Sequence, residues 1–163
     1  MKLIVKIFLQ VFNIFLIIFL TGCAGQRYHS TVAPTAPATR AFFDWPLEGR
    51  VLSRYGARED GVTLKGVVLH GSEGQEVRAA GEGRVVYVDE GMRGYGKTVV
   101  LEHAEGYSTV YARSSQVLVA VGERVRRGQA IARVGGAGKG ATPQLYFEVR
   151  QDTQPLDPER VLK

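Results

Sequence analysis

The segment that most clearly indicates the fold is residues 144–150, which read Gln144-Leu145-Tyr146-Phe147-Glu148-Val149-Arg150. Apolar residues alternate there with more polar ones, a pattern typical of a β-strand with one buried face. Six stretches upstream have a similar β-type composition: Arg50–Tyr55, Leu64–His70, Gly83–Glu90, Lys97–His103, Tyr107–Ala112 and Ile131–Val134.

Glycines separate these stretches, and most of the 20 glycines of the chain fall in this region, as tight turns between short strands require. No segment of ten or more residues shows the 3.6-residue period of an amphipathic helix. The sequence therefore predicts an all-β, antiparallel sandwich or barrel-like domain over residues 42–163.

The amino terminus has a different character. Lys2 and Lys6 precede an apolar run that ends at Leu20, and the small residues Thr21 and Gly22 follow. This order predicts a secretory signal peptide over residues 1–22. A membrane anchor is the alternative, although spanning takes about 20 apolar residues and this run is shorter.

Cys23 favours a lipoprotein. It is the single cysteine, so no disulfide can form within the chain. The stretch Leu20-Thr21-Gly22-Cys23 resembles a bacterial lipobox, which implies that Cys23 is lipidated and becomes the first mature residue. Ala24 resembles the pattern of outer-membrane sorting, which implies an anchor that faces the periplasm. Residues 23–41 are rich in Ala, Thr, Pro and Gly and predict a flexible tether.

The overall composition is compatible with several partners. The 163 residues suffice for one domain plus a targeting segment, and hydrophobic residues make up 45%. The formal net charge is +5, and it is nearer +3 without Lys2 and Lys6. Such a mildly basic chain suits an anionic envelope, an acidic partner or simply a solvated surface. We expect no nucleic-acid partner.

The glycine-rich stretch Gly135–Gly140 superficially suggests a phosphate-binding loop. A P-loop needs Ser or Thr directly after its Gly-Lys pair to bind the metal, and Gly140 occupies that position after Lys139. The stretch is therefore interpreted as a loop between two strands.

Several segments together resemble the LytM-type (lysostaphin-like) peptidoglycan peptidase domain, from about Trp45 to Leu162. The segments that carry the resemblance are Lys65–Leu69, Gly74–Val77, Ala80–Val86, Gly94–Gly96, Leu101–His103, Tyr107–Ala112, Val121–Gln129 and Leu145–Arg150. The resemblance implies an antiparallel β-structure with a central groove.

Active members of that family bind zinc through the His and Asp of a His-x-x-x-Asp motif and the second His of a late His-x-His motif. The first His of that pair and the His of a Tyr-x-His segment assist the attacking water. Catalytic zinc needs three protein ligands and an open water site, and imidazoles handle the protons of the water. The matching positions in this chain are Leu64, Val68, Arg113, Gln144 and Tyr146. The resemblance therefore implies a domain with no metal, no cofactor and no catalytic residue.

Three histidines remain, and they do not restore a site. His29 lies in the tether, His70 has the same strand parity as Val68, and His103 ends a predicted strand. One imidazole in the groove is not a catalytic zinc site, and His103 is interpreted as structural.

These departures resemble one subgroup of the family, the catalytically inactive LytM-domain activators of cell-wall amidases. The resemblance implies a protein that relieves the autoinhibition of a zinc N-acetylmuramoyl-L-alanine amidase, so that septal peptidoglycan is cut and daughter cells separate. It implies an amidase as partner, peptidoglycan as a second candidate partner, and attachment to the membrane through Cys23.

The altered groove has the composition of a protein-binding surface. Tyr and Arg are enriched at binding hot spots, and an apolar floor with a cationic rim suits an amphipathic helix with acidic flanks. Strand parity places Gln144, Tyr146 and Arg150 on one face, and Tyr111 with Arg113. The alternative is that the tyrosines only fill space. The predicted groove residues are Leu64, Lys65, Val68, Tyr95, Tyr111, Arg113, Gln144, Tyr146 and Arg150.

Three other functions stay open from the sequence. The first is a residual metallopeptidase with unusual ligands, and the second is a wall-binding or scaffolding module. The third is a lipoyl-like carrier, because Gly122–Ile131 resembles that motif; however, Lys97 lacks the usual flanking residues, and export argues against cytosolic acyl transfer.

Overall fold

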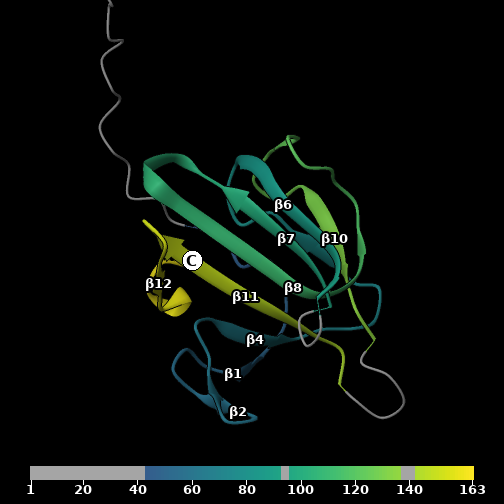
Figure 1. Cartoon of the computed structure of the whole chain (residues 1–163). Helices are drawn as coiled ribbons and strands as arrows, with labels where there is room; N and C mark the ends of the chain where they lie inside the picture. The colour runs from purple at the N-terminus through teal and green to yellow at the C-terminus, as the bar shows by residue number, and fades with distance from the viewer. Residues whose placement is uncertain (1–42, 93–95, 137–141) are drawn as a thin grey trace, which may run out of the picture. The chain divides into compact units, whose positions relative to one another are not determined.

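The computed structural model describes residues 43–92, 96–136 and 142–163. These residues form twelve strands and two short 3-10 helices (Figure 1). The elements are β1 (Val51–Ser53), β2 (Arg58–Glu59), β3 (Val62–Thr63), β4 (Val67–His70), β5 (Glu76–Arg78), β6 (Gly83–Met92), β7 (Gly96–Glu102), η1 (Ala104–Gly106), β8 (Tyr107–Val117), β9 (Arg124–Val125), β10 (Ala130–Val134), β11 (Gln144–Gln151), β12 (Gln154–Leu156) and η2 (Pro158–Arg160).

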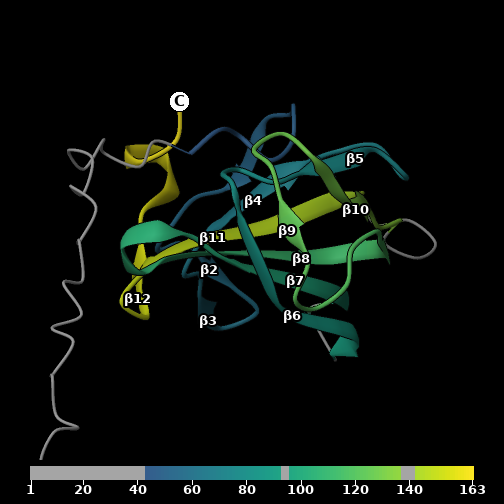
Figure 2. The ribbon, with the colours of Figure 1, turned by 90° about the horizontal axis from the view of Figure 1, so that it is seen from above.

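One ten-stranded antiparallel sheet dominates the domain. Its main path is β1-β4-β11-β8-β7-β6-β9, and β12 extends it beside β11. β10 pairs with both β5 and β8, so the sheet folds back on itself (Figure 2). The hairpin β2–β3 forms a separate two-stranded sheet. The predicted all-β, antiparallel, barrel-like fold is confirmed.

The core lies on one face of this sheet. Val67, Phe147, Tyr111 and Val99 are neighbours across β4, β11, β8 and β7, and each is fully buried. Because successive residues of a strand point to opposite faces, the residues next to these four along each strand point to the other, outer face of the sheet. Side chains from β5 and β10, including Val77 and Ile131, complete the same core cluster.

The sequence located seven of these strands, including three-residue β1 within the stretch Arg50–Tyr55, and missed five others. β2, β3, β5, β9 and β12 have two or three residues each, too few to show alternation. β4 begins at Val67 instead of Leu64, because the amide of Leu64 donates to the carbonyl of Ala57 and closes the β2–β3 hairpin. β8 continues to Val117, five residues past the predicted end at Ala112.

The first described residues are tied to the last. Phe43 forms an isolated bridge with Leu162, and its ring packs against His103 and Tyr107. Among the described residues, no helix is long and apolar enough to cross a membrane. The predicted signal peptide (1–22), Cys23, the tether (23–41) and Tyr95 lie outside the described residues.

Candidate functional site

A second, smaller apolar cluster lies on the outer face of the sheet. It consists of Leu64, Val68, Ala112 and Tyr146, with Ala57 packed against it. Tyr146 is the cross-strand partner of both Val68 and Ala112, so these three side chains share the face opposite the core. We call this group the outer cluster.

The five positions that the family resemblance singled out converge at the outer cluster. Leu64, Val68 and Tyr146 belong to it directly. The guanidinium carbon of Arg113 lies 5.7 Å from the centroid of the Tyr146 ring, within the range of a cation–π contact. Gln144 lies two residues from Tyr146 on the same strand face, opposite His70. Residues from three distant parts of the chain therefore meet at one place.

Arg113 reaches this face through a backbone irregularity. Its φ is 67°, in the left-handed region, and the pairing of β7 with β8 shifts register between Lys97/Ser114 and Val99/Tyr111. The extra residue lets Arg113 point to the same side as Ala112. A Cβ on Gly96 would lie 3.3 Å from the Arg113 Cα, so the neighbouring strand passes very close here.

Tyr111 does not share that face, contrary to the prediction from strand parity. It is the cross-strand partner of Phe147, has no exposed surface, and packs in the main core. Its hydroxyl accepts a hydrogen bond of 2.9 Å from the amide of Ala80. Strand parity fails because Arg113 itself lies in the irregular part of β8, so Tyr111 and Arg113 do not point to the same face. Tyr111 therefore supports the sheet from behind.

A short charged network continues along β11. The Tyr146 hydroxyl donates to Glu148 Oε1 at 2.5 Å, and Arg150 Nε donates to Glu148 Oε2 at 2.6 Å. The Glu148 side chain is only 4% exposed, whereas that of Arg150 is 38% exposed. Glu148 is thus a buried carboxylate that depends on these two partners. Glu148 is not among the predicted groove residues, although it has the same strand parity as Tyr146 and Arg150.

The β2–β3 hairpin is joined to the site by Glu59. Arg113 Nη2 donates to Glu59 Oε2 at 3.1 Å, and Ser53 Oγ donates to Glu59 Oε1 at 2.6 Å. The Ser53 hydrogen bond, followed by Arg113, lowers the pKa of Glu59. This contact holds the hairpin beside Ala57 and Leu64 of the outer cluster.

The apolar residues of the site are covered in this structure. Val68 has no exposed surface, Tyr146 is 3% exposed and Leu64 is 8% exposed. Lys65 is exposed, and Arg113, Gln144 and Arg150 are half-buried. The site therefore presents a polar and cationic rim above a filled interior, which agrees with the interpretation that Tyr146 fills space.

Zinc does not fit the side chains at this place. Leu64 and Val68 carry no donor atom, Arg113 is a cation, and the Tyr146 hydroxyl is engaged with Glu148. Among residues 43–163, outside the two gaps, no group of three His, Cys, Asp or Glu side chains lies close enough to hold a metal ion.

His103 lies away from the site in a structural network. Its Nδ1 is 2.6 Å from the carbonyl of Glu82, which can only accept, and its Nε2 is 2.8 Å from Thr109 Oγ1. Thr109 Oγ1 is 3.0 Å from the Tyr111 hydroxyl. Burial lowers the pKa of His103 and raises the pKa of Tyr111 to about 12.

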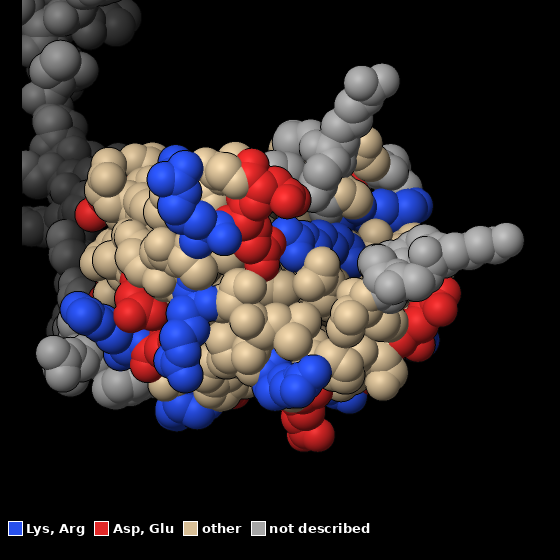
Figure 3. All heavy atoms as spheres, turned by 90° about the horizontal axis from the view of Figure 1, so that it is seen from below, with Lys and Arg blue, Asp and Glu red and all other residues tan. Residues whose placement is uncertain are grey.

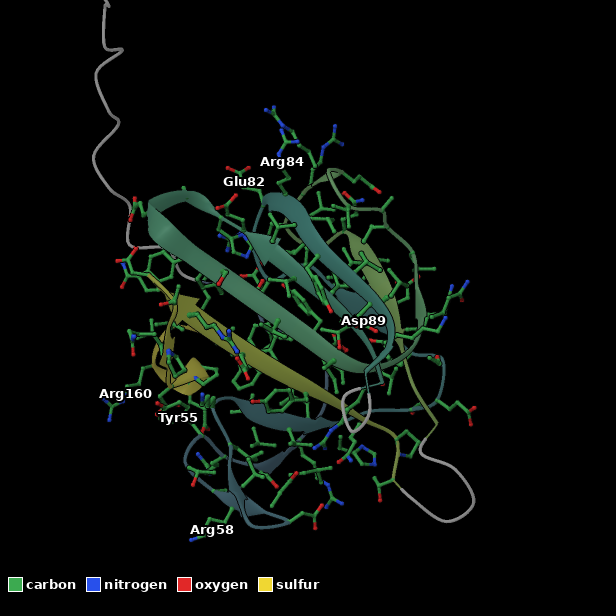
Figure 4. All side chains as sticks on the ribbon, in the orientation of Figure 1. Tyr55, Arg58, Glu82, Arg84, Asp89 and Arg160 are labelled. Carbon is green, nitrogen blue, oxygen red and sulfur yellow. The ribbon has the colours of Figure 1, made fainter. Side chains whose placement is uncertain are left out.

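A separate shallow hollow lies beside the carboxyl-terminal 3-10 helix, with Tyr55 and Arg160 on its border (Figure 4). Next to Tyr55 in the sequence, Arg54 Nη1 donates to both carboxylate oxygens of Glu159. None of the predicted groove residues lines this hollow.

The outer sheet face of this antiparallel β-domain carries tyrosine, arginine and aliphatic side chains at the positions that the family resemblance assigns to metal ligands. The sequence matches peptidase family M23 over residues 63–158, more than half of the chain. The chain belongs to this family.

Curated relatives are named murein hydrolase activators or an outer membrane lipoprotein. The chain is 44% identical to the murein hydrolase activator EnvC of Escherichia coli (strain K12) over 76% of this chain and 29% of that protein. It is 36% identical to the murein hydrolase activator NlpD of Salmonella dublin, over 82% and 36%. It is 35% identical to the outer membrane antigenic lipoprotein B of Haemophilus influenzae, over 82% and 32%. The chain thus spans about a third of the length of these relatives.

Solved structures share the fold. A zinc-containing peptidase from Vibrio cholerae superposes with a TM-score of 0.64 and 30% identity, over 73% of this chain and 39% of that one. EnvC and NlpD are named murein hydrolase activators, whereas this structural neighbour is named a peptidase.

Proposed function

We propose that this protein is a non-catalytic activator of a periplasmic zinc N-acetylmuramoyl-L-alanine amidase and promotes septal peptidoglycan hydrolysis and daughter-cell separation. The observation that carries the proposal is the outer cluster of Leu64, Val68 and Tyr146, side chains that the family resemblance assigns to metal-ligand positions. The names of EnvC and NlpD support activation of a murein hydrolase as the role of such a domain.

Binding explains this site better than catalysis does. Hydrolysis by zinc needs three ligands, an open position and a group that handles the proton of the water. A filled cluster with an arginine above it offers none of these. In this proposal the domain is not an enzyme, and its site works through contacts with another protein.

The proposed contacts lie on the rim of the site. Lys65, Arg113, Gln144 and Arg150 present polar and cationic groups, and Leu64, Val68 and Tyr146 support them from below. Tyr95 belongs to the same proposed surface, and Tyr111 acts only as core support. A cationic rim selects an amidase segment with acidic side chains, such as a regulatory helix.

The proposed location is the outer membrane, with the domain facing the periplasm on a lipid attached to Cys23. The lipobox-like stretch before Cys23 and the name of lipoprotein B from Haemophilus influenzae support this location. A lipid anchor and a tether would keep the domain close to the wall that the amidase cuts.

Dye release from labelled sacculi tests the proposal. The full chain in detergent is assayed alone and with each zinc amidase of the host. We expect no release by the chain alone and faster release with one amidase. Chelator-sensitive release by the chain alone would show a metallopeptidase instead. No stimulation of any amidase, combined with co-sedimentation with sacculi, would favour a wall-binding module.

A further inference from the structure

The outer sheet face extends well beyond the site, toward β7 and β6. Glu148, Val110, Val100 and Tyr87 are successive cross-strand partners on β11, β8, β7 and β6. Glu148 lies two residues after Tyr146 on β11 and therefore points to the same face. The other three are cross-strand partners in turn, so they point to this face as well. The outer face is therefore one continuous surface from β4 to β6.

This extension carries exposed apolar side chains, which the site itself lacks. The pairing of β6 with β7 shifts register between Val85 and Tyr87, and this bulge turns both Val86 and Tyr87 outward. Val86 is 43% exposed and Tyr87 is 39% exposed, while Val100 beside them is half-buried. We call Val86, Tyr87 and Val100 the β6–β7 strip.

A charged row borders the strip. Arg150, Ser108, Glu102, Arg84 and Arg124 are successive cross-strand partners on β11, β8, β7, β6 and β9. Arg84 and Arg124 are directly opposite each other and both exposed, an arrangement that costs stability because like charges repel. In Figure 4, Arg84 and Glu82 lie at one end of β6 and Asp89 toward the other. The strip thus has a cationic pair on one side.

We propose that the β6–β7 strip is a second contact surface for the amidase, which docks an amphipathic helix with an acidic flank across the strands. The proposal rests on the proposed function and deepens it. The apolar stripe of the helix would cover Val86, Tyr87 and Val100. An acidic side chain of the helix would lie between Arg84 and Arg124 and relieve their repulsion.

The dimensions suit a helix. Strands lie about 4.8 Å apart, so Val100 lies about 5 Å across the sheet from its partner Tyr87. One helical turn covers about 5.4 Å, and residues at i and i+3 or i+4 would meet β6 and β7 in order. A glycan strand, by contrast, gains little from three aliphatic and aromatic side chains, so a protein segment fits the strip better.

The test measures the concentration of full-length chain in detergent that gives half-maximal stimulation of the amidase identified by dye release. One variant combines Val86→Thr and Tyr87→Thr, which remove apolar contact and place threonine, a residue with high β-propensity, at both positions. Leu118→Thr is its control, because Leu118 is also 39% exposed but follows β8, outside the strip. The second variant is Arg124→Glu, with Arg78→Glu on β5 as its control.

We expect the strip variant and Arg124→Glu each to raise the half-maximal concentration about tenfold, and the controls to leave it unchanged. Arg124→Glu would pair with Arg84, so its thermal stability should not fall, and its effect should shrink at 0.5 M salt. Unchanged stimulation by both variants would overturn the strip and leave the proposed function intact. Lost sacculus binding with unchanged stimulation would overturn it in favour of a wall ligand. No stimulation by the unaltered chain would overturn both proposals.

Discussion

Arg113 shows how a single backbone conformation determines what the site presents. A non-glycine residue in the left-handed region costs roughly 1 kcal/mol, and this one is held between β7 and the segment after β10. The conformation directs the guanidinium over the Tyr146 ring and onto Glu59. Backbone strain that persists in a folded protein is often found at functional sites. Arg113 is therefore a residue at which a loss of function can be measured with little loss of stability.

Arg113→Gly tests this separation. Glycine relieves the strain and loses a partly exposed ion pair, so the thermal midpoint should change by only a few degrees. Stimulation of the amidase should fall at least tenfold because the rim loses its cation. The matched control is Asp60→Gly, at another exposed left-handed position with φ of 48°, which should keep full stimulation. Equal stimulation by Arg113→Gly and the unaltered chain would contradict the role assigned to Arg113.

At the scale of elements, β11 organises the site. One face of this strand carries core residues such as Phe147, and the other carries Tyr146, Glu148 and Arg150 in hydrogen-bonded sequence. On one edge of β11, β4 pairs with the first half and β12 with the second half. Glu148 lies at the junction between these two pairings. Gly66 fits here because a Cβ would lie 2.1 Å from the carbonyl of Phe147. Seen from below in Figure 3, acidic and basic side chains lie interspersed around uncharged surface.

The two partners of the ion pair on β11 should respond unequally to substitution. Arg150→Gln leaves the buried Glu148 carboxylate without its cation and should cost about 3 kcal/mol, since a buried charge without its partner is expensive. Glu148→Gln leaves Arg150 free to turn to solvent and should cost less, roughly 1 kcal/mol. Urea unfolding at pH 7 measures both. A larger loss for Glu148→Gln would show that the carboxylate is not the dependent partner.

At the scale of the whole domain, a hydrogen-bonded network links segments that are far apart in sequence. It runs from the amide of Ala80 through Tyr111 and Thr109 to His103 and the carbonyl of Glu82. The ring of Phe43 packs on His103, so the start of the domain is attached to the same network. The network supports the core behind the site, and burial favours the neutral form of its imidazole.

The network predicts a stability that depends on pH. Burial, together with the nearby Arg127, lowers the folded-state pKa of His103 below the unfolded value of about 6.5. The unfolded chain therefore binds more protons as pH falls, so this contribution is full above about pH 6.5 and is lost progressively below it. The urea midpoint should decrease from pH 7 to pH 5, and this decrease should be smaller for His103→Gln than for the unaltered chain. An equal decrease in both proteins would exclude His103 as the source of the pH dependence.

The sequence by itself determined the all-β class and located seven strands, and the family resemblance assigned Leu64, Val68 and Tyr146 to metal-ligand positions. Alternation of period two and residue chemistry are local properties, so they can be read without a structure. Only the tertiary structure decided which of these side chains are accessible. Tyr111 faces the core and Arg113 the site, because a bulge whose register depends on β7 and β10 lies between them. The tertiary structure also buries Tyr146 and leaves Val86 and Tyr87 exposed, since the burial of a side chain depends on which distant residues pack against it.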